Sequence, residues 1–97
     1  MEFTDRLTGF EWDTGNEQKN AKHGVTPAEA EQVFLNEPLI VIDDLKHSKT
    51  EQRFHALGTT TEKRLLHITF TIRNDKIRVI SVRDMHRKER AIYEQET

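Results

Sequence analysis

The feature that most constrains the fold of this chain is a segment in which apolar and polar residues alternate one by one. Over residues 65–72 every second residue is a large apolar one, a period typical of a β-strand with one buried face. The next pair, Asn74 and Asp75, favours a tight two-residue turn, and residues 77–83 are apolar on both faces, as expected of a central strand. The pattern predicts a β-hairpin in the middle of an antiparallel sheet.

Two further strands and a capped helix precede this hairpin. Residues 39–42 are leucine and β-branched residues, and residues 53–59 alternate again, so both segments are predicted to be strands. The polar residues 43–52 between them predict a loop. Upstream, Thr26-Pro27-Ala28-Glu29 combines an N-cap threonine, a proline at the first helical position and a glutamate at N3. This capping box predicts a helix that ends at Asn36-Glu37-Pro38.

The two ends of the chain are predicted to add one strand and two helices. Residues 10–12 alternate and suit a short strand, and residues 16–23 form a helix that Gly24 stops. Residues 84–96 are predicted to be a C-terminal helix, whose inward residues are Met85, Ala91 and Ile92. Residues 1–9 are polar and form an ordered or frayed arm.

The predicted fold class is α+β, in a single domain over residues 1–97, with the element order β-α-α-β-β-β-β-α. Successive strands with short connections give an antiparallel meander. The helices must bury the sheet face that carries Phe54, Ile68 and Phe70, because an amphipathic helix needs an apolar surface. The opposite face is left open or only partly covered, and it is expected to carry Arg53, His55, His67 and Thr69.

Composition excludes several classes of protein. The chain has no Cys, so disulfide scaffolds, cysteine zinc sites and thiol nucleophiles are excluded. The longest apolar run, residues 39–42, is far below the roughly 20 residues of a membrane helix, and the N-terminus does not resemble a signal peptide. We therefore expect a soluble, cytoplasmic protein. No phosphate-binding glycine loop, HExxH or EF-hand pattern is present, so no cofactor or metal is expected, although His55 and His67 leave a metal site as an alternative.

Charge is divided unevenly along the chain. Residues 1–52 carry five Lys or Arg against eleven Asp or Glu, whereas residues 53–97 carry ten against six. Most of the basic residues in the second part are arginines, whose planar fork matches phosphate in two-point contacts. They are Arg53, Arg64, Arg73, Arg78, Arg83, Arg87 and Arg90. This distribution favours a local anion site, and solvation of the surface is the alternative.

The residues needed for metal-free cleavage of RNA are present. Such cleavage needs a base for the 2′-hydroxyl, an acid for the 5′-oxygen and cations for the phosphate. Histidine titrates near neutrality, and a tyrosine can stack on a base or donate a proton. The expected catalytic residues are Arg53, His55, Arg64, His67 and Arg83. The expected RNA-binding residues are Arg78, Arg87, Tyr93, Lys19 and Lys22.

Each candidate also has a structural interpretation. Histidines on a half-buried sheet face are often hydrogen-bonded parts of the fold. Arg78 and Arg83 are five residues apart, so a regular strand places them on opposite faces unless a bulge intervenes. On the last helix, Arg87 and Arg90 can form weak surface pairs with Glu94. Charged residues that need only cap a helix or solvate a loop are Lys19, Lys22, Asp43 and Asp44.

Segments spread over the whole chain resemble the BrnT toxin family. They are Phe10-Glu11-Trp12-Asp13, residues 19–25 (KNAKHGV), residues 30–34 (AEQVF), His47-Ser48, Glu51-Gln52-Arg53, Gly58, Arg64, residues 77–83 (IRVISVR), residues 87–90 (RKER) and Tyr93-Glu94. The resemblance runs from Phe10 to Glu94. It implies a RelE-like fold and a ribonuclease toxin of a type II toxin–antitoxin pair, with mRNA as the substrate class.

The same resemblance implies partners and a site. A BrnA-type antitoxin is expected to neutralise the toxin, in a two-plus-two complex that reaches operator DNA only through the antitoxin, with no membrane involved. The basic active-surface residues of the family fall on Arg53, Arg64, Arg78 and Arg83, beside the last helix. Two other functions stay open at this point: a module that binds nucleic acid or protein without turnover, and a structural partner that acts only within an autoregulatory complex.

Overall fold

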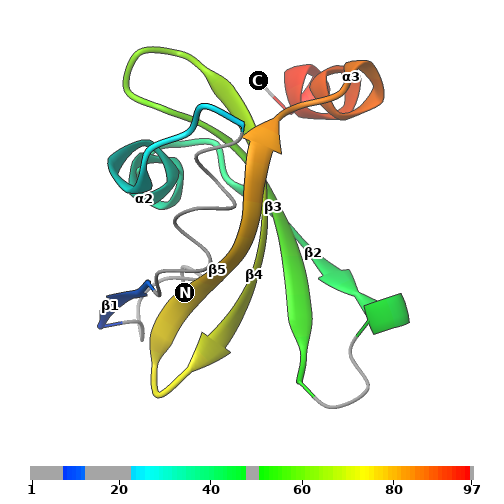
Figure 1. Ribbon diagram of the computed structural model, residues 1–97. Helices are drawn as coiled ribbons and strands as arrows, with labels where there is room; N and C mark the ends of the chain where they lie inside the picture. The colour runs from blue at the N-terminus through cyan, green and yellow to red at the C-terminus, as the bar shows by residue number, and fades with distance from the viewer. Residues whose placement is uncertain (1–7, 13–22, 48–50, 97) are drawn as a thin grey trace.

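The computed structural model describes residues 8–12, 23–47 and 51–96, and it shows one sheet with a helix on either side (Figure 1). The elements, in chain order, are β1 (Gly9–Glu11), α2 (Pro27–Leu35), β2 (Ile40–Asp44), a 3₁₀ turn (Leu45–His47), β3 (Arg53–Thr59), β4 (Leu65–Arg73), β5 (Lys76–Asp84) and α3 (Arg87–Gln95). The α+β class is confirmed. Most of the first predicted helix, residues 16–22, lies outside the described residues, as do residues 1–7 of the N-terminal arm.

The sheet has five strands in the order β1-β5-β4-β3-β2. Strands β2 to β5 form the predicted antiparallel meander. The prediction of a fully antiparallel sheet is wrong at β1, which pairs in parallel with β5 and sets Phe10 opposite Ile77. No short turn joins β1 to β5, since the chain first runs through α2 to the other edge of the sheet, so hairpin geometry does not dictate the direction of β1.

The central hairpin forms as predicted. Strands β4 and β5 are joined by Asn74 and Asp75 alone, with φ angles of 55° and 60°. Positive φ at both positions is the requirement of the type I′ turn, which asparagine and aspartate tolerate. At the far edge, β2 extends to Asp44 instead of ending at residue 42, because Asp44 pairs with Arg53 of β3. The start of the predicted loop at residue 43 is therefore wrong.

Helix α2 begins with the predicted capping box. The hydroxyl of Thr26 accepts a hydrogen bond from the Glu29 amide at 3.1 Å, and the Glu29 carboxylate accepts one from the Thr26 amide at 3.0 Å. Two of the amides that every helix start leaves unpaired are thereby satisfied. Gly24, just before this start, has a φ of +68°, which suits its predicted place after a helix end.

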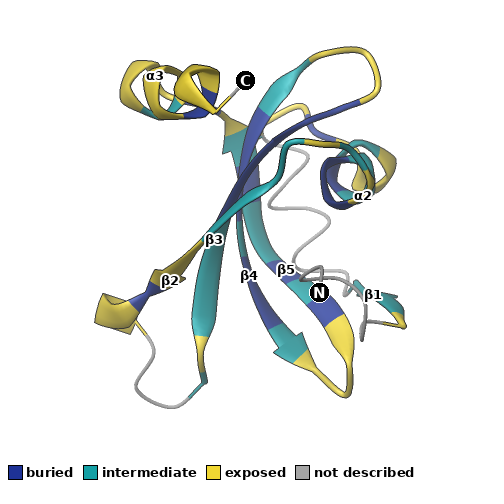
Figure 2. Cartoon of the chain, turned by 180° about the vertical axis from the view of Figure 1, so that it is seen from behind, coloured by how far each residue is buried: buried dark blue, intermediate teal, exposed yellow. Residues whose placement is uncertain are grey.

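The main core lies between α2 and the sheet, on the face predicted to be buried. The ring of Phe70 stacks on Phe54 at 5.3 Å and meets Phe34 of α2 edge-on at 5.1 Å. Figure 2 shows buried positions on α2 and the neighbouring strands. The core residues are Val25, Ala30, Val33, Phe34, Ala56, Leu66, Ile68, Phe70, Ile77, Val79 and Val82. At the closest point, Gly58 lets α2 approach β3, since a Cβ atom there would lie 2.6 Å from Cγ1 of Val33.

Helix α3 packs on the opposite face, at one end of the sheet. Its Tyr93 joins Leu57 and Met85 in a second buried cluster. The prediction that all helices cover one face is therefore wrong for α3. Ala91 and Ile92, predicted to point inward, are exposed. The helix begins after His86 and not at residue 84, and the residue that it buries is Tyr93.

Candidate active site on the open face of the sheet

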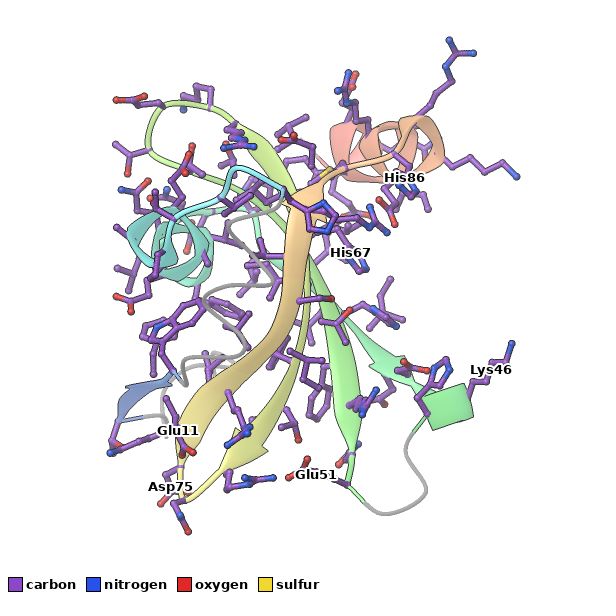
Figure 3. The ribbon with its side chains drawn as sticks, in the orientation of Figure 1. Glu11, Lys46, Glu51, His67, Asp75 and His86 are labelled. Carbon is purple, nitrogen blue, oxygen red and sulfur yellow. The ribbon has the colours of Figure 1, made fainter. Side chains whose placement is uncertain are left out.

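The sheet face opposite α2 gathers most of the predicted site residues, and we refer to it as the open face. Its central residues are Arg53, His55, His67, Thr69, Thr71, Arg78, Ser81 and Arg83. They share this face because directly paired residues of neighbouring strands point to the same side of a sheet. Helix α3 covers one end of the face, above His67 (Figure 3).

A β-bulge in β5 brings two arginines to the open face. Thr69 of β4 lies opposite Ser81, but the next residue, Phe70, lies opposite Val79, so Ile80 has no partner in β4. The extra residue reverses the alternation of β5. Arg78 consequently pairs with Thr71 and Arg83 with His67, and both point to the open face.

The two predicted histidines touch each other at the centre of the face. Nδ1 of His55 lies 3.0 Å from Nε2 of His67 and 3.2 Å from the hydroxyl of Thr69. The two rings have their centroids 4.9 Å apart. On its other side, Nε2 of His55 lies 3.0 Å from a carboxylate oxygen of Asp44. The structure thus joins Asp44, His55 and His67 in one chain of polar contacts.

Burial fixes the protonation state of His67. Only 11% of its side chain is exposed, and its Nδ1 is buried with no hydrogen-bond partner in the described part of the chain. Burial, followed by the positive charge of Arg83, lowers the pKa of His67 to about 4. The ring is neutral at pH 7, with its proton on Nε2 as the donor to His55, because a buried unpaired N–H is the costlier alternative. His55 then keeps its own proton on Nε2, toward Asp44, and a lone pair on Nδ1.

Asp44 is a site residue that sequence reasoning missed. Its side chain is 8% exposed and accepts hydrogen bonds from the backbone amide of His47 at 3.1 Å and from Nδ1 of His47 at 3.0 Å. Burial acts to raise the pKa of the Asp44 carboxyl, but the hydrogen bonds from His47 outweigh it and the pKa lies below its ordinary value. The available signal was its position three residues before a histidine, at the end of a strand.

Glu89 of α3 is the second residue that was missed. It binds Arg83 in a two-point contact, with Nη1–Oε1 at 2.8 Å and Nη2–Oε2 at 3.0 Å, and it accepts from the His86 amide at 2.8 Å. Burial would raise the pKa of Glu89, but the hydrogen bonds from Arg83 and the His86 amide lower it to about 2. Its carboxylate also lies 4.0 Å from Nε2 of His67, so an anion already occupies this corner of the face.

Arg53 and Arg78 lie at the other end of the face. Both pair with Thr71 of β4, one from each side, and Arg53 also lies opposite Asp44. Nη1 of Arg78 lies 3.0 Å from the carboxylate of Glu11 in β1. Of the five residues predicted to be catalytic, the structure brings four to the open face: Arg53, His55, His67 and Arg83.

Arg64, also predicted to bind phosphate, is the exception and does not lie on this face. Its guanidinium is bound by Asp84 at 2.8 Å and 3.2 Å, by Glu29 at 3.1 Å and by two backbone carbonyls, of His23 and Gly24. These partners lie at the start of α2 and the end of β5, on the side away from the histidines. Arg64 therefore ties α2 to the sheet and has its donors already engaged.

Tyr93, predicted to bind RNA, is buried in the free protein. It is 3% exposed, and its hydroxyl donates to the Pro38 carbonyl at 2.7 Å, so it has no exposed ring for a base. Burial raises its pKa. Arg87, by contrast, is exposed on α3 and lines a shallow hollow of about 420 Å³ with Arg90 and Glu94. Lys19 and Lys22 lie outside the described residues.

Two further features of the described residues concern metal binding and membrane insertion. No three His, Asp or Glu side chains among them are arranged to hold a metal ion. None of the helices traced in those segments is long and apolar enough to cross a membrane.

Fold and site together define a class: a small α+β protein with histidines and arginines gathered on one exposed sheet face, a surface suited to a polyanion. The sequence gives the family. Residues 12–89 match the family described as ribonuclease toxin, BrnT, of type II toxin–antitoxin systems, and the chain belongs to this family. No curated protein matches the chain. The resemblance inferred from the residues is confirmed, and a type II system implies an antitoxin partner.

Proposed function

We propose that this protein is a metal-independent, RelE-like endoribonuclease that cleaves mRNA on the open face and is neutralised by a BrnA-type antitoxin. The observation that carries the proposal is the placement of His55. Its Nε2 is held by Asp44 at 3.0 Å, and its row of the face lies between the rows of Arg53 and Arg83. A base held in one tautomer between two phosphate-binding groups is what transesterification of RNA requires.

In the proposed reaction, His55 is the base. Its Nδ1, which carries the lone pair, takes the proton of the 2′-hydroxyl, and the 2′-oxygen attacks the adjacent phosphorus. To reach Nδ1, the 2′-hydroxyl must displace both groups that lie on that nitrogen in the free protein, the Nε2–H of His67 at 3.0 Å and the hydroxyl of Thr69 at 3.2 Å. Before the substrate binds, His67, neutral and buried, holds the His55 ring in position through this contact. The products are a 2′,3′-cyclic phosphate and a new 5′-hydroxyl end.

The arginines of the open face neutralise the phosphate as charge builds on its oxygens. Arg53, Arg78 and Arg83 come from two strands and flank the histidines. Arg78 and Arg83 are paired with Glu11 and Glu89 in the free protein, so RNA must displace these carboxylates. The same arginines also suit the second candidate function, a binding module without turnover. With either function, the toxin and the antitoxin form a complex with two copies of each chain, and the antitoxin is the part that contacts DNA.

The test is cleavage of end-labelled RNA by the isolated protein in EDTA. We expect fragments that end in a 2′,3′-cyclic phosphate, and a loss of about 10²–10⁴-fold in rate for His55→Ala. Lys63→Gln, which removes a charge from the β3–β4 turn, is the matched control and should cleave normally. Cleavage that stops in EDTA would contradict the metal-free mechanism. RNA binding without cleavage would support the binding module.

A further inference from the structure

The histidines near the open face differ in how many of their ring nitrogens have partners in the free protein. Both nitrogens of His55 are engaged, by Asp44 on one side and by His67 and Thr69 on the other. Nδ1 of His67 is buried. His47, on the 3₁₀ turn after β2, differs from both, because its side chain is 58% exposed and only its Nδ1 has a partner among the described residues, namely Asp44.

Asp44 brings the His47 ring next to the site. A single oxygen of its carboxylate, Oδ2, lies 3.0 Å from Nδ1 of His47 and 3.0 Å from Nε2 of His55. The 3₁₀ turn makes this possible, since it folds the chain back so that both the amide and the ring of His47 bond Asp44. The two rings therefore meet the same carboxylate, and each turns its second nitrogen away from it.

We propose that His47 is the general acid of the RNA cleavage reaction, with its Nε2 donating a proton to the departing 5′-oxygen. This inference rests on the proposed function, in which His55 is the base. As the bond between the 2′-oxygen and phosphorus forms, His55 gains the proton of the 2′-hydroxyl. As the bond between phosphorus and the 5′-oxygen breaks, protonated His47 gives its Nε2 proton to that oxygen. The two histidines then return to their starting states by exchange with water.

The surroundings of His47 suit this role. The Asp44 carboxylate accepts from Nδ1 of this partly exposed side chain, which leaves Nε2 as the ring nitrogen for a substrate. The charged groups next to it on its own turn and strand are Lys46, Asp43 and Asp44, and those on the neighbouring strand are His55 and Arg53. Because Arg53 lies opposite Asp44, a phosphate bound by Arg53 lies at the same edge of the face as His47.

His67 is the less suitable acid, although the sequence predicted it, with His55, to be catalytic. Its Nε2 points to His55 and its Nδ1 is buried, so neither nitrogen reaches a leaving group. With a pKa of about 4, the ring also carries no proton to donate beyond the one that it shares with His55. Its position supports His55, and the acid must come from another group.

The experiment compares two substrates that differ only in their need for an acid. The leaving group of an RNA oligonucleotide is a 5′-alkoxide, which needs a proton. The leaving group of uridine 3′-(p-nitrophenyl phosphate) is a stable phenolate, which does not. For His47→Ala we expect the rate on RNA to fall about 10²–10³-fold, with the rate on the nitrophenyl ester within about threefold of wild type. His55→Ala should lose activity on both substrates.

The controls separate this proposal from the one it rests on. His23→Ala removes an exposed imidazole on the opposite side of the sheet and should match wild type on both substrates, and circular dichroism checks the fold of each variant. An equal loss on both substrates, or no loss on RNA, for His47→Ala overturns the role of His47 and leaves the ribonuclease proposal standing. A wild-type protein that cleaves neither substrate overturns both.

Discussion

Arg78 and Arg83 lie on the same face of β5, although their positions differ by five, an odd number that places two residues on opposite faces of a regular strand. The bulge at Ile80 causes this, since it adds one residue to β5 without a partner in β4. Without the bulge, one of the two guanidinium groups would point into the core under α2. The open face owes its two β5 arginines to a single unpaired residue.

Both arginines are therefore expected to contact RNA. For Arg78→Gln and Arg83→Gln, the slope of log K against log salt concentration should become shallower by about 0.7 each, the value for one phosphate contact on a single strand. The measurement is a titration of a 2′-O-methyl RNA, which cannot be cleaved, at several salt concentrations. Lys63→Gln should leave the slope unchanged. If Arg78→Gln leaves the slope unchanged, Arg78 does not contact a phosphate of the RNA.

The parts of the fold that were predicted correctly depend on local chemistry. The Asn74-Asp75 turn needs positive φ at two adjacent residues, and the capping box needs only Thr26 and Glu29 three positions apart. The pairing of β1 with β5 joins segments far apart in the chain, and no local signal reports it. The same holds for α3, whose face depends on where the helix begins after His86.

The site was predictable as a face but not as a set of contacts. Alternation in β3 and β4 placed Arg53, His55 and His67 on one side of the sheet. Asp44 and Glu89 were missed because each reaches the face from an element whose end or direction the sequence does not define, namely the last residue of β2 and the first turn of α3. Composition predicted that Arg64 binds phosphate. In the structure its guanidinium instead donates hydrogen bonds to two carboxylates and two backbone carbonyls.

Arg64 is expected to matter for stability more than for chemistry. Arg64→Ala leaves Asp84 and Glu29 without their shared partner and unties α2 from the sheet, so the free energy of unfolding should fall by about 2–3 kcal/mol. Urea denaturation measures this fall. Arg73→Ala, which breaks one exposed pair with Glu51, is the control and should change stability little. The folded fraction of Arg64→Ala should cleave RNA as wild type does. A loss of cleavage without a loss of stability would show that Arg64 takes part in the reaction.

His67 is expected to make the protein sensitive to mild acid. Its pKa is about 4 in the folded protein, below its ordinary value of 6.5, so the unfolded chain binds the proton more readily. Unfolding should become easier as pH falls from about 6.5 to 4, by on the order of 3 kcal/mol in total. Denaturant midpoints from pH 4 to 8 should show this slope in wild type and a shallower slope in His67→Gln, which keeps only the contribution of the carboxylates whose pKa values are lowered. An identical slope in both proteins would show that folding does not lower the pKa of His67.

Gly58 is expected to be essential for the packing of α2 on β3. A Cβ atom at this position would meet Cγ1 of Val33 at 2.6 Å and the Val33 carbonyl at 3.4 Å, so Gly58→Ala should cost about 1–3 kcal/mol of stability. If the clash with the valine side chain is the cause, Val33→Ala should relieve it, and the double variant should be more stable than the sum of the two single losses. Gly24→Ala is the contrasting case, because nothing lies within 4 Å and its cost comes from a φ of +68°. That cost should not change when Val33→Ala is added. Strictly additive losses for Gly58→Ala and Val33→Ala would place the strain in the backbone of β3 and not in its contact with α2.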